Sequence, residues 1–338
     1  MSGKKRKRLA PSATPWDGKA DDELSPAEAL VAASHRSMYE FRHSAFEGDA
    51  AFFNSYARDA CPWCGSGSVI RFGIDKTGLQ RYRCKTCSKT FTPATGTIFD
   101  DRKLPLSAWA DFLVQVFSYE SSNAMTREDR RSITTVPYWM AKLFSVLDGI
   151  QDGVVLSGRV QIDETYYPVP VAQAIAVDGK KLRGLSRNKL CIGVGCDSGG
   201  RSLFDWEGYG KTSGAKTWGA FGGHVEVGST LAHDMEKGHR RLVRDLSLVS
   251  EEYSSKELAR LPDKENPLRE VNRLCFLLKG FLDSHSGFDR ADLPGYLNVF
   301  HVMMNDPADK MEKAAMVLDR AMSCPKTLRF REFYRRNP

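Results

Sequence analysis

Hydrophobic residues follow two different periods along this chain. In residues 106–117 and 136–147 they recur at helical spacing, and by the same criterion residues 26–57 favour one or two amphipathic helices. After Gly158 the spacing becomes that of strands. The strand-like segments are residues 160–166, 190–197 and 201–206, of which the last two can form a hairpin across Ser198-Gly199-Gly200. The pattern predicts a helical first half and a second half that begins with three strands.

The three strands are consecutive and suited to antiparallel pairing, and the first carries the acid pair Asp163-Glu164. Helical patterns follow, the clearest at residues 268–282, where apolar residues form a stripe. This order predicts an α/β core of the RNase H-like type over residues 153–305. Glu164 is expected on the opposite face of the strand from Asp163, because successive side chains alternate. Residues 306–338 should form a C-terminal helical basic tail.

Composition is ordinary for a folded protein, and 338 residues suffice for two or three compact units. The excess of 49 Lys and Arg over 42 Asp and Glu is modest but clustered, which makes nucleic acid a candidate partner. No apolar run is long enough for a membrane span. The basic run Lys4–Arg8 lacks a following apolar segment, so secretion is not indicated. We expect a cytoplasmic, nucleoid-associated protein in a bacterium, or a nuclear one in a eukaryote.

Residues 1–25 are expected to form a basic flexible tail. Its basic run could simply be solvated, could contact phosphate groups or could be a nuclear localisation signal. Four of the eight cysteines form two C-x-x-C pairs within residues 58–96, separated by a hairpin-like segment. This spacing predicts a zinc ribbon with one tetrahedral Zn²⁺ ion. The alternatives are a disulfide or a spacing that arose by chance. The predicted zinc ligands are Cys61, Cys64, Cys84 and Cys87.

Lysines and arginines gather in two places that suit a DNA backbone. One group surrounds the cysteine pairs and is interleaved with aromatic residues, although a merely solvated face is the alternative. The other lies in the loop between the first two strands. The apolar spacing in residues 97–152, between these groups, predicts short helices. They could form a helix-turn-helix-like DNA-binding region or be part of a plain hydrophobic core. The candidate DNA contacts are Arg81, Arg83, Lys85, Lys180, Lys181, Arg183, Arg187 and Lys189.

Several sequence motifs alternate with these segments along the chain. After the zinc ribbon come "TGTIFDDRKLPLSAW", the helical region, "VQIDETYY", the basic loop, "CIGVGCDSGG", "LAHDMEKGH" and "VNRLCFLLKGFLDSHSGFDRADLPGYLNVF". This order resembles the insertion-sequence transposases of the IS fifteen-ninety-five family, which are DDE-type enzymes. The resemblance covers residues 58–305 and implies a metal-dependent phosphoryl transferase acting on DNA.

The resemblance implies a catalytic site with two divalent ions, Mg²⁺ or Mn²⁺, on hard oxygen ligands. Asp163 matches the first metal-bridging aspartate, and Asp234 matches the second acid. His239 lies near the second acid and is a candidate DNA or scissile-phosphate contact. Asn272 stands at the third position, with Lys279 seven residues further on and therefore on the same helical face.

An asparagine at the third position departs from the DDE pattern. Its amide oxygen can bind Mg²⁺ but brings no negative charge, so metal affinity should be weaker than with glutamate. Glu265 and Glu270 stay open as alternatives, although Glu265 should precede a helix that starts at Asn266-Pro267, and Glu270 should face away from Lys279.

These implications describe a transposase that binds terminal inverted repeats and catalyses DNA strand cleavage and strand transfer. Its partner would be double-stranded DNA, with at least a dimer assembled on two transposon ends. Two alternatives remain: a catalytically decayed or retained zinc-ribbon DNA-binding regulator, and a nuclease on the same fold.

Overall fold

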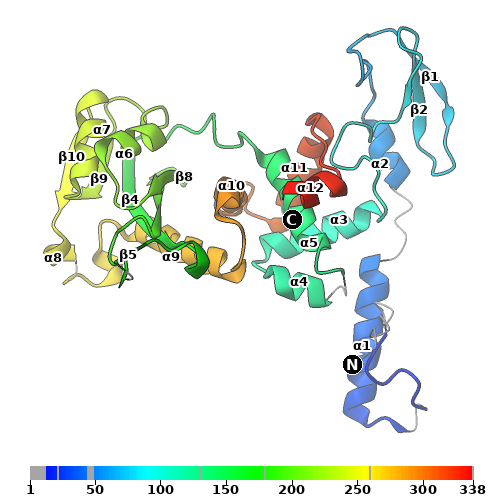
Figure 1. The fold of residues 1–338 in the computed structure, drawn as a ribbon, viewed down its shortest axis with the longest axis horizontal. Coiled ribbons are helices and arrows are strands. Elements are labelled where there is room, and N and C mark those ends of the chain that lie inside the picture. Colours follow the sequence, from blue (N-terminus) through cyan, green and yellow to red (C-terminus); the bar gives the residue numbers. More distant parts are fainter. Residues whose placement is uncertain are drawn as a thin grey trace. The chain divides into compact units, whose positions relative to one another are not determined.

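The computed structural model describes residues 13–20, 23–43, 49–128, 131–178, 180–258 and 260–336. The chain forms two compact units (Figure 1), one of Met1–Lys142 with Ala314–Pro338 and the other of Leu143–Lys313. The basic run Lys4–Arg8 lies outside the described residues. None of the helices within these ranges combines the length and the apolar character needed to cross a membrane.

The first unit is mainly helical around an aromatic core. The Trp109 and Trp139 rings stack with centroids 4.3 Å apart, and Phe112 meets the Trp139 ring edge-on. These residues recur at helical spacing, so burying their stripe stabilises the predicted helices. The predictions at 106–117 and 136–147 are confirmed. The helices in this unit are α1 (Pro26–His43), α2 (Asp49–Ser55), α3 (Leu106–Phe117), α4 (Ser122–Glu128), α5 (Thr135–Leu147), α11 (Lys310–Ser323) and α12 (Phe330–Arg336), of which α5 and α11 cross the boundary between the units.

The C-terminal residues are part of this helical unit. The Tyr138 hydroxyl on α5 donates to the Leu328 carbonyl at 2.7 Å. Its ring also contacts Phe330 and Phe333, with centroids 5.4 Å and 5.7 Å away. Aromatic contacts of this kind add to the free energy of area burial. The aromatic C-terminal segment therefore packs against α5.

The same unit contains a three-stranded antiparallel sheet in the order β1-β2-β3. Its strands are β1 (Val69–Ile74), β2 (Gln80–Cys84) and β3 (Thr90–Phe91). The Asp75 carboxylate closes the β1–β2 turn by accepting from the Thr77 and Leu79 amides at 2.8 Å and 3.0 Å. Gly78 supplies the positive φ of 81° that this turn needs. The turn signals in the sequence thus locate the hairpin correctly.

The second unit is built on a five-stranded mixed sheet in the order β10-β9-β4-β7-β8. β4, β7 and β8 are successive antiparallel neighbours, whereas β9 and β10 run parallel to β4 on its other side. The three predicted strands and the hairpin at Ser198-Gly199-Gly200 are confirmed. The strands are β4 (Arg159–Pro168), β7 (Lys189–Asp197), β8 (Ser202–Tyr209), β9 (Thr230–Asp234) and β10 (Val249–Tyr253).

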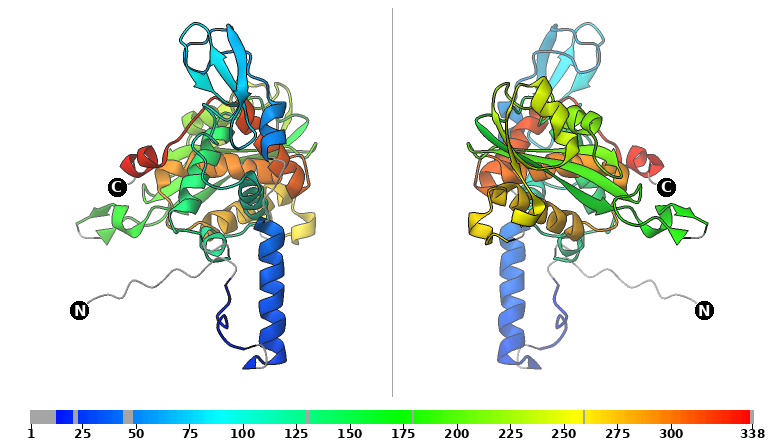
Figure 2. Two further views of the ribbon diagram at one scale, coloured as in Figure 1. Left: turned by 90° about the vertical axis from the view of Figure 1, so that its right-hand side faces the viewer. Right: turned by 90° about the vertical axis from the view of Figure 1, so that its left-hand side faces the viewer.

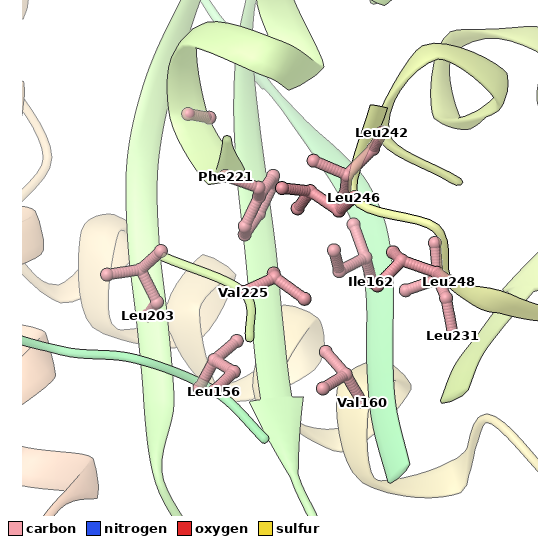
Figure 3. Packing of buried hydrophobic residues seen from close by; sticks show 11 residues of the cluster. Leu156, Val160, Ile162, Leu203, Phe221, Val225, Leu231, Leu242, Leu246 and Leu248 are labelled. Carbon is pink, nitrogen blue, oxygen red and sulfur yellow. The ribbon is translucent and has the colours of Figure 1, made fainter. Parts of the chain in front are cut away.

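Helices cover both faces of this sheet. On one face, Val160 and Ile162 of β4 belong to a buried cluster (Figure 3) with Phe221 and Leu242, which come from α6 and α7. A Cβ atom added to Gly193 on β7 would lie 2.7 Å from the Phe221 ring, so glycine lets the ring rest on the strand. On the other face lie α9 and α10. The helices are α6 (Gly214–Phe221), α7 (Arg240–Asp245), α8 (Ser255–Leu258), α9 (Arg269–Ser284) and α10 (Leu293–Met304).

The loop between β4 and β7 contains a two-stranded hairpin, β5 (Ala176–Val177) and β6 (Lys180–Lys181). Figure 2 shows it projecting from the sheet. The Asn188 side chain holds its base by accepting from the Ile175 amide at 2.7 Å and donating to the Ile175 carbonyl at 2.9 Å. Of the basic residues of this loop, Lys180 and Lys181 therefore form the second strand of the hairpin, and Arg183 and Arg187 follow it.

Candidate metal centres and basic surface

The four thiols of the two C-x-x-C pairs form one cluster. The Sγ atoms of Cys61 and Cys87 are 3.6 Å apart, and those of Cys64 and Cys84 are 3.7 Å apart. All four sulfurs lie within 4.8 Å of one another. Four sulfurs bound to a tetrahedral zinc ion at about 2.3 Å would be separated by about 3.8 Å. The cluster therefore has the dimensions of a structural zinc site.

The two cysteine knuckles share one backbone conformation. In each, the first cysteine's amide donates to the carbonyl five residues on, at 2.9 Å from Cys61 and 3.0 Å from Cys84. The residue after the second cysteine has a left-handed φ, 70° at Gly65 and 59° at Ser88. The Cys87 amide donates to the Cys84 sulfur and lowers the pKa of that thiol to about 6. This amide thus favours at Cys84 the thiolate form that binds metal, whereas burial and the neighbouring thiols raise the pKa of the Cys64 thiol.

Cationic and aromatic side chains lie together on the β1–β2 hairpin and on the two cysteine knuckles. The guanidinium groups of Arg81 and Arg83 lie 5.3 Å and 5.4 Å from the centre of the Phe72 ring. The Lys89 ammonium lies 5.0 Å from the centre of the Trp63 ring. Both rings are exposed, by 39% for Phe72 and 48% for Trp63. Such pairs hold positive charge at the surface, where phosphate groups can reach it.

The other predicted DNA contacts are mostly exposed. Lys85 is exposed in the second cysteine knuckle. The remainder belong to the loop with the β5–β6 hairpin, where only Lys189, at the start of β7, is half-buried. The exposed members of this loop are Lys180, Lys181, Arg183 and Arg187.

Asp163 and Asp234 lie side by side on adjacent parallel strands. Gln161 of β4 pairs with Ala232 of β9, and each aspartate lies two residues further along its strand. Burial raises the pKa of Asp163 to about 6, and the charges of Glu164 and Asp234 add to this effect. Within the described residues, neither aspartate forms an ion pair with a lysine or arginine. The pair therefore has negative charge that no described lysine or arginine neutralises and that a divalent cation can bind, although a protonated His239, with its Nδ1 atom 4.0 Å from Asp234 Oδ1, would offset part of it.

Helix α9 covers the Asp163 side of β4. The Val271 amide lies in the first turn, where an N–H has no acceptor within the helix, and it donates to the Gln161 Oε1 atom at 3.2 Å. One turn later, Cys275 is buried, and both burial and the charge of Asp163 raise the pKa of its thiol. The apolar stripe predicted at residues 268–282 therefore packs against the sheet.

Asn272 and Lys279 are exposed residues of α9, beside its buried stripe. Both project in nearly the same direction, because seven residues make almost two full turns. Among the described contacts, no hydrogen bond joins the Asn272 side chain to Asp163 or Asp234. The structure therefore brings the two aspartates together and places Asn272 and Lys279 on the neighbouring helix.

The two alternative acids have other surroundings. Glu270 is held on the surface of α9 by Arg269 at 2.8 Å and Arg273 at 3.2 Å. Glu265 is exposed in a short 3₁₀ turn before the helix. The expected helix start at Asn266 is wrong, since the Asn266 side chain accepts from the Leu268 amide at 2.8 Å and α9 begins at Arg269.

Glu164 points to the opposite face of β4, as alternation predicts, and enters a buried histidine network. Its Oε1 atom lies 2.9 Å from His239 Nε2, and His239 Nδ1 lies 3.1 Å from His233 Nδ1. Burial alone would lower the pKa of His239, but the hydrogen bond and charge of Glu164, with the charges of Asp234 and Asp163, raise it. The His239 side chain has no exposed surface. A phosphate contact by His239 would therefore require these bonds to be replaced.

A second buried acid, which the sequence did not single out, lies near Glu164. Glu207 of β8 is 8% exposed, and its Oε2 atom accepts from the Thr212 hydroxyl at 2.5 Å. Burial and the charge of Glu164 raise the pKa of Glu207 to about 7. His233 was also missed, although its position directly before Asp234 and six residues before His239 is a signal in the sequence.

Comparison with known proteins supplies one connection. No family model matches this chain. Over 130 residues the chain is 33% identical to an uncharacterized protein in transposable element ISH50 of Halobacterium salinarum. The match covers 37% of this chain and 42% of the relative, so the chain spans less than half of that protein.

Proposed function

We propose that this protein is the transposase of an insertion sequence, which binds terminal inverted repeats and catalyses metal-dependent DNA cleavage and strand transfer. The observation that carries this proposal is the pair Asp163 and Asp234 on adjoining strands, in a chain similar to a protein of a transposable element. Paired carboxylates are the ligands that divalent-metal phosphoryl transfer needs. The relative's similarity supplies the biological context, and the aspartate pair supplies the chemistry.

The strand arrangement supports an RNase H-like core of the DDE type. Three antiparallel strands, β4, β7 and β8, lie next to the parallel strands β9 and β10, with helices on both faces. Asp163 lies on the central strand and Asp234 at the end of its parallel neighbour. In this proposal α9 supplies the third position, which makes the site a D-D-N variant.

The residues at this site fit Mg²⁺ or Mn²⁺. These ions prefer oxygen ligands, and the two aspartates offer carboxylates that no lysine or arginine among the described residues pairs with. When bound, the ions would activate the attacking oxygen and stabilise the leaving oxygen. Asp163 and Asp234 would hold the ions, and Asn272 would add an uncharged amide oxygen. Lys279, on the same face of α9, would bind the DNA backbone.

DNA binding is assigned to the zinc ribbon, the helices α3–α5 and the β5–β6 hairpin. The Arg81 and Arg83 pair over Phe72 and the exposed cations of the hairpin offer phosphate contacts. The helix-turn-helix-like segment would enter a major groove. Pairing of two transposon ends requires at least a dimer on the DNA.

The test is cleavage of a duplex that carries the inverted repeats flanking the coding region, in the presence of Mg²⁺. Asp163→Ala and Asp234→Ala should each reduce cleavage by about 10²-fold or more while end binding in a mobility-shift assay stays unchanged. Asp245→Ala is the matched control, since Asp245 is exposed and paired with Arg241 and Arg244. Unchanged cleavage in either site variant would remove these residues from the mechanism.

The products separate the alternatives. Cleavage followed by joining to target DNA identifies a transposase, and cleavage without joining identifies a nuclease on the same fold. End binding without any cleavage by the wild-type protein identifies a zinc-ribbon DNA-binding regulator and contradicts the proposal.

A further inference from the structure

Two buried histidines turn the same ring nitrogen toward one point beside Asp234. His233 Nδ1 and His239 Nδ1 are 3.1 Å apart, and Asp234 Oδ1 lies 4.0 Å from His239 Nδ1. All three potential ligand atoms lie within 4.8 Å of one another. The histidines are 1% and 0% exposed, so this arrangement is fixed by the interior of the unit. Two nitrogens and one carboxylate oxygen thus converge from β9 and the turn that follows it.

The outward nitrogens of both rings already have partners. His239 Nε2 lies 2.9 Å from the Glu164 carboxylate, and His233 Nε2 lies 3.0 Å from the Ser250 hydroxyl. In the neutral ring, a carboxylate on Nε2 makes that nitrogen the N–H donor and leaves the Nδ1 lone pair facing inward, so a metal ion at Nδ1 would take the place of a second proton. Metal-binding histidines are commonly oriented in this way, with the second nitrogen donating to a carboxylate or another acceptor.

We propose that His233 Nδ1, His239 Nδ1 and Asp234 bind one transition-metal ion of the Mn²⁺ or Zn²⁺ class, with Glu164 orienting His239 from behind. Metal–nitrogen bonds of about 2.1 Å place neighbouring ligand nitrogens about 3.0–3.4 Å apart, and 3.1 Å lies within this range. Asp234 is the ligand that has to shift toward the histidines. Its side chain is 34% exposed and therefore has room to turn.

Ligand chemistry decides which ions this site would take. Imidazole nitrogens suit Mn²⁺ less than Zn²⁺ but far better than they suit Mg²⁺, which keeps to oxygen ligands. Asp234 would belong to two sites, the carboxylate pair with Asp163 and the proposed site with the two histidines, so these sites would adjoin each other. The histidine site's role in DNA cleavage rests on the proposed function, whereas its capacity to bind a metal does not.

The same 3.1 Å also fits a direct hydrogen bond between the two rings, so the experiment must detect the ligand atoms themselves. The full-length protein, with zinc already in its cysteine cluster, is given Mn²⁺ without DNA. Pulsed electron paramagnetic resonance then reports ¹⁴N couplings from imidazoles bound directly to Mn²⁺. We expect nitrogen couplings in the wild-type protein, fewer in His239→Asn or His233→Asn, and none in the double variant. Each single variant should bind Mn²⁺ at least about 10-fold more weakly, a loss of about 1.4 kcal/mol.

The matched control is His224→Asn, which removes a half-buried imidazole whose Nδ1 lies 2.8 Å from the Val154 carbonyl. It should leave the nitrogen couplings unchanged, and circular dichroism checks that every variant is folded. Mn²⁺ bound through oxygen alone in the wild-type protein overturns the proposal without any variant, as does the absence of binding. Neither result bears on cleavage at Asp163, while nitrogen couplings in a protein that does not cut DNA would contradict only the proposed function.

Discussion

The cysteine cluster and the aspartate pair are both suited to metal ions, but they stand in different relations to their hydrophobic cores. In the ribbon, Cys61 and Cys84 are themselves half of a small buried cluster whose other members are Tyr82 and Phe91. The aspartate pair instead lies on a sheet whose opposite face is covered by eleven buried residues, none of them a proposed ligand. A metal ion bound by the four thiols would thus be part of the fold of their small unit, whereas an ion bound by the aspartates would be added to a fold that already exists.

The largest expected effect is the loss of zinc from the ribbon. Cys84→Ser should abolish zinc binding and unfold residues 58–96, because structural zinc supplies on the order of 10 kcal/mol to such small units. Metal analysis should show the loss of zinc, and the amide resonances of β1–β3 should collapse to unfolded positions. The resonances of β4, β7 and β8 should not change, since that sheet has its own core.

Cys324→Ser is the control, since Cys324 lies outside the cluster. It should retain zinc and the folded ribbon. If Cys84→Ser kept both, the four thiols would not form a structural metal site, and the contrast between the two regions would fail.

The second effect is a gain in the free energy of unfolding, because without a bound ion the buried charge of Asp163 should destabilise the folded state. The pKa of Asp163 is raised from 3.8 to about 6, so the folded state binds this proton more tightly than the unfolded state does. The resulting stability is present below pH 4 and is lost as the pH rises through 6. In Asp163→Asn this loss is absent, so the variant should be more stable than the wild-type protein by about 3 kcal/mol at pH 8 without divalent ions.

Urea unfolding at pH 4 and pH 8 measures this difference. It should nearly vanish at pH 4 and shrink at pH 8 when Mg²⁺ is added, since the ion stabilises only the wild-type site. Asp197→Asn is the contrasting control. Asp197 is buried and bonds Arg201 at 2.7 Å, so its loss should destabilise the unit. A less stable Asp163→Asn variant at pH 8 would show that the pair is not strained without a metal.

The two regions also differ in how far the sequence determines them. The cluster of four thiols follows from two local spacings, and the hairpin between them follows from the turn at Asp75–Gly78, so both could be predicted from adjacent residues alone. The strands β4, β7 and β8 were found in the same way. Whether their sheet belongs to the RNase H-like class remains a proposal.

The surroundings of the aspartates depend on tertiary contacts. The sequence indicated that Glu164 faces away from Asp163, but its partner is 75 residues away at His239. His233 joins this network only because β9 pairs with β4 in one particular register. The start of α9 was misplaced for a local reason, since Asn266 closes a separate turn instead of capping the helix.

A smaller effect is expected at the third position of the proposed site. Asn272→Glu adds a negative charge, so Mg²⁺ should bind about 10-fold more tightly, or by about 1.4 kcal/mol, if Asn272 is a ligand. Isothermal titration of the full-length protein measures the change. Glu270→Gln is the control and should have no effect, because Glu270 is already paired with Arg269 and Arg273. The same affinity in Asn272→Glu and wild type would exclude Asn272 and leave Glu265 as the acid to test.

The smallest effect returns to the ribbon, where the surface rather than the metal should contact DNA. Arg83→Ala removes one cation from above the Phe72 ring, so the slope of log K against log salt for DNA binding should fall by about 0.9, the value for one phosphate contact. Arg83→Lys should keep the slope, since it keeps the charge. Arg36→Ala is the control, because Arg36 is exposed but already bonded to Asp17 at 3.0 Å. An unchanged slope in Arg83→Ala would mean that the ribbon's cationic and aromatic face is solvated surface, and that its zinc ion stabilises a unit with another role.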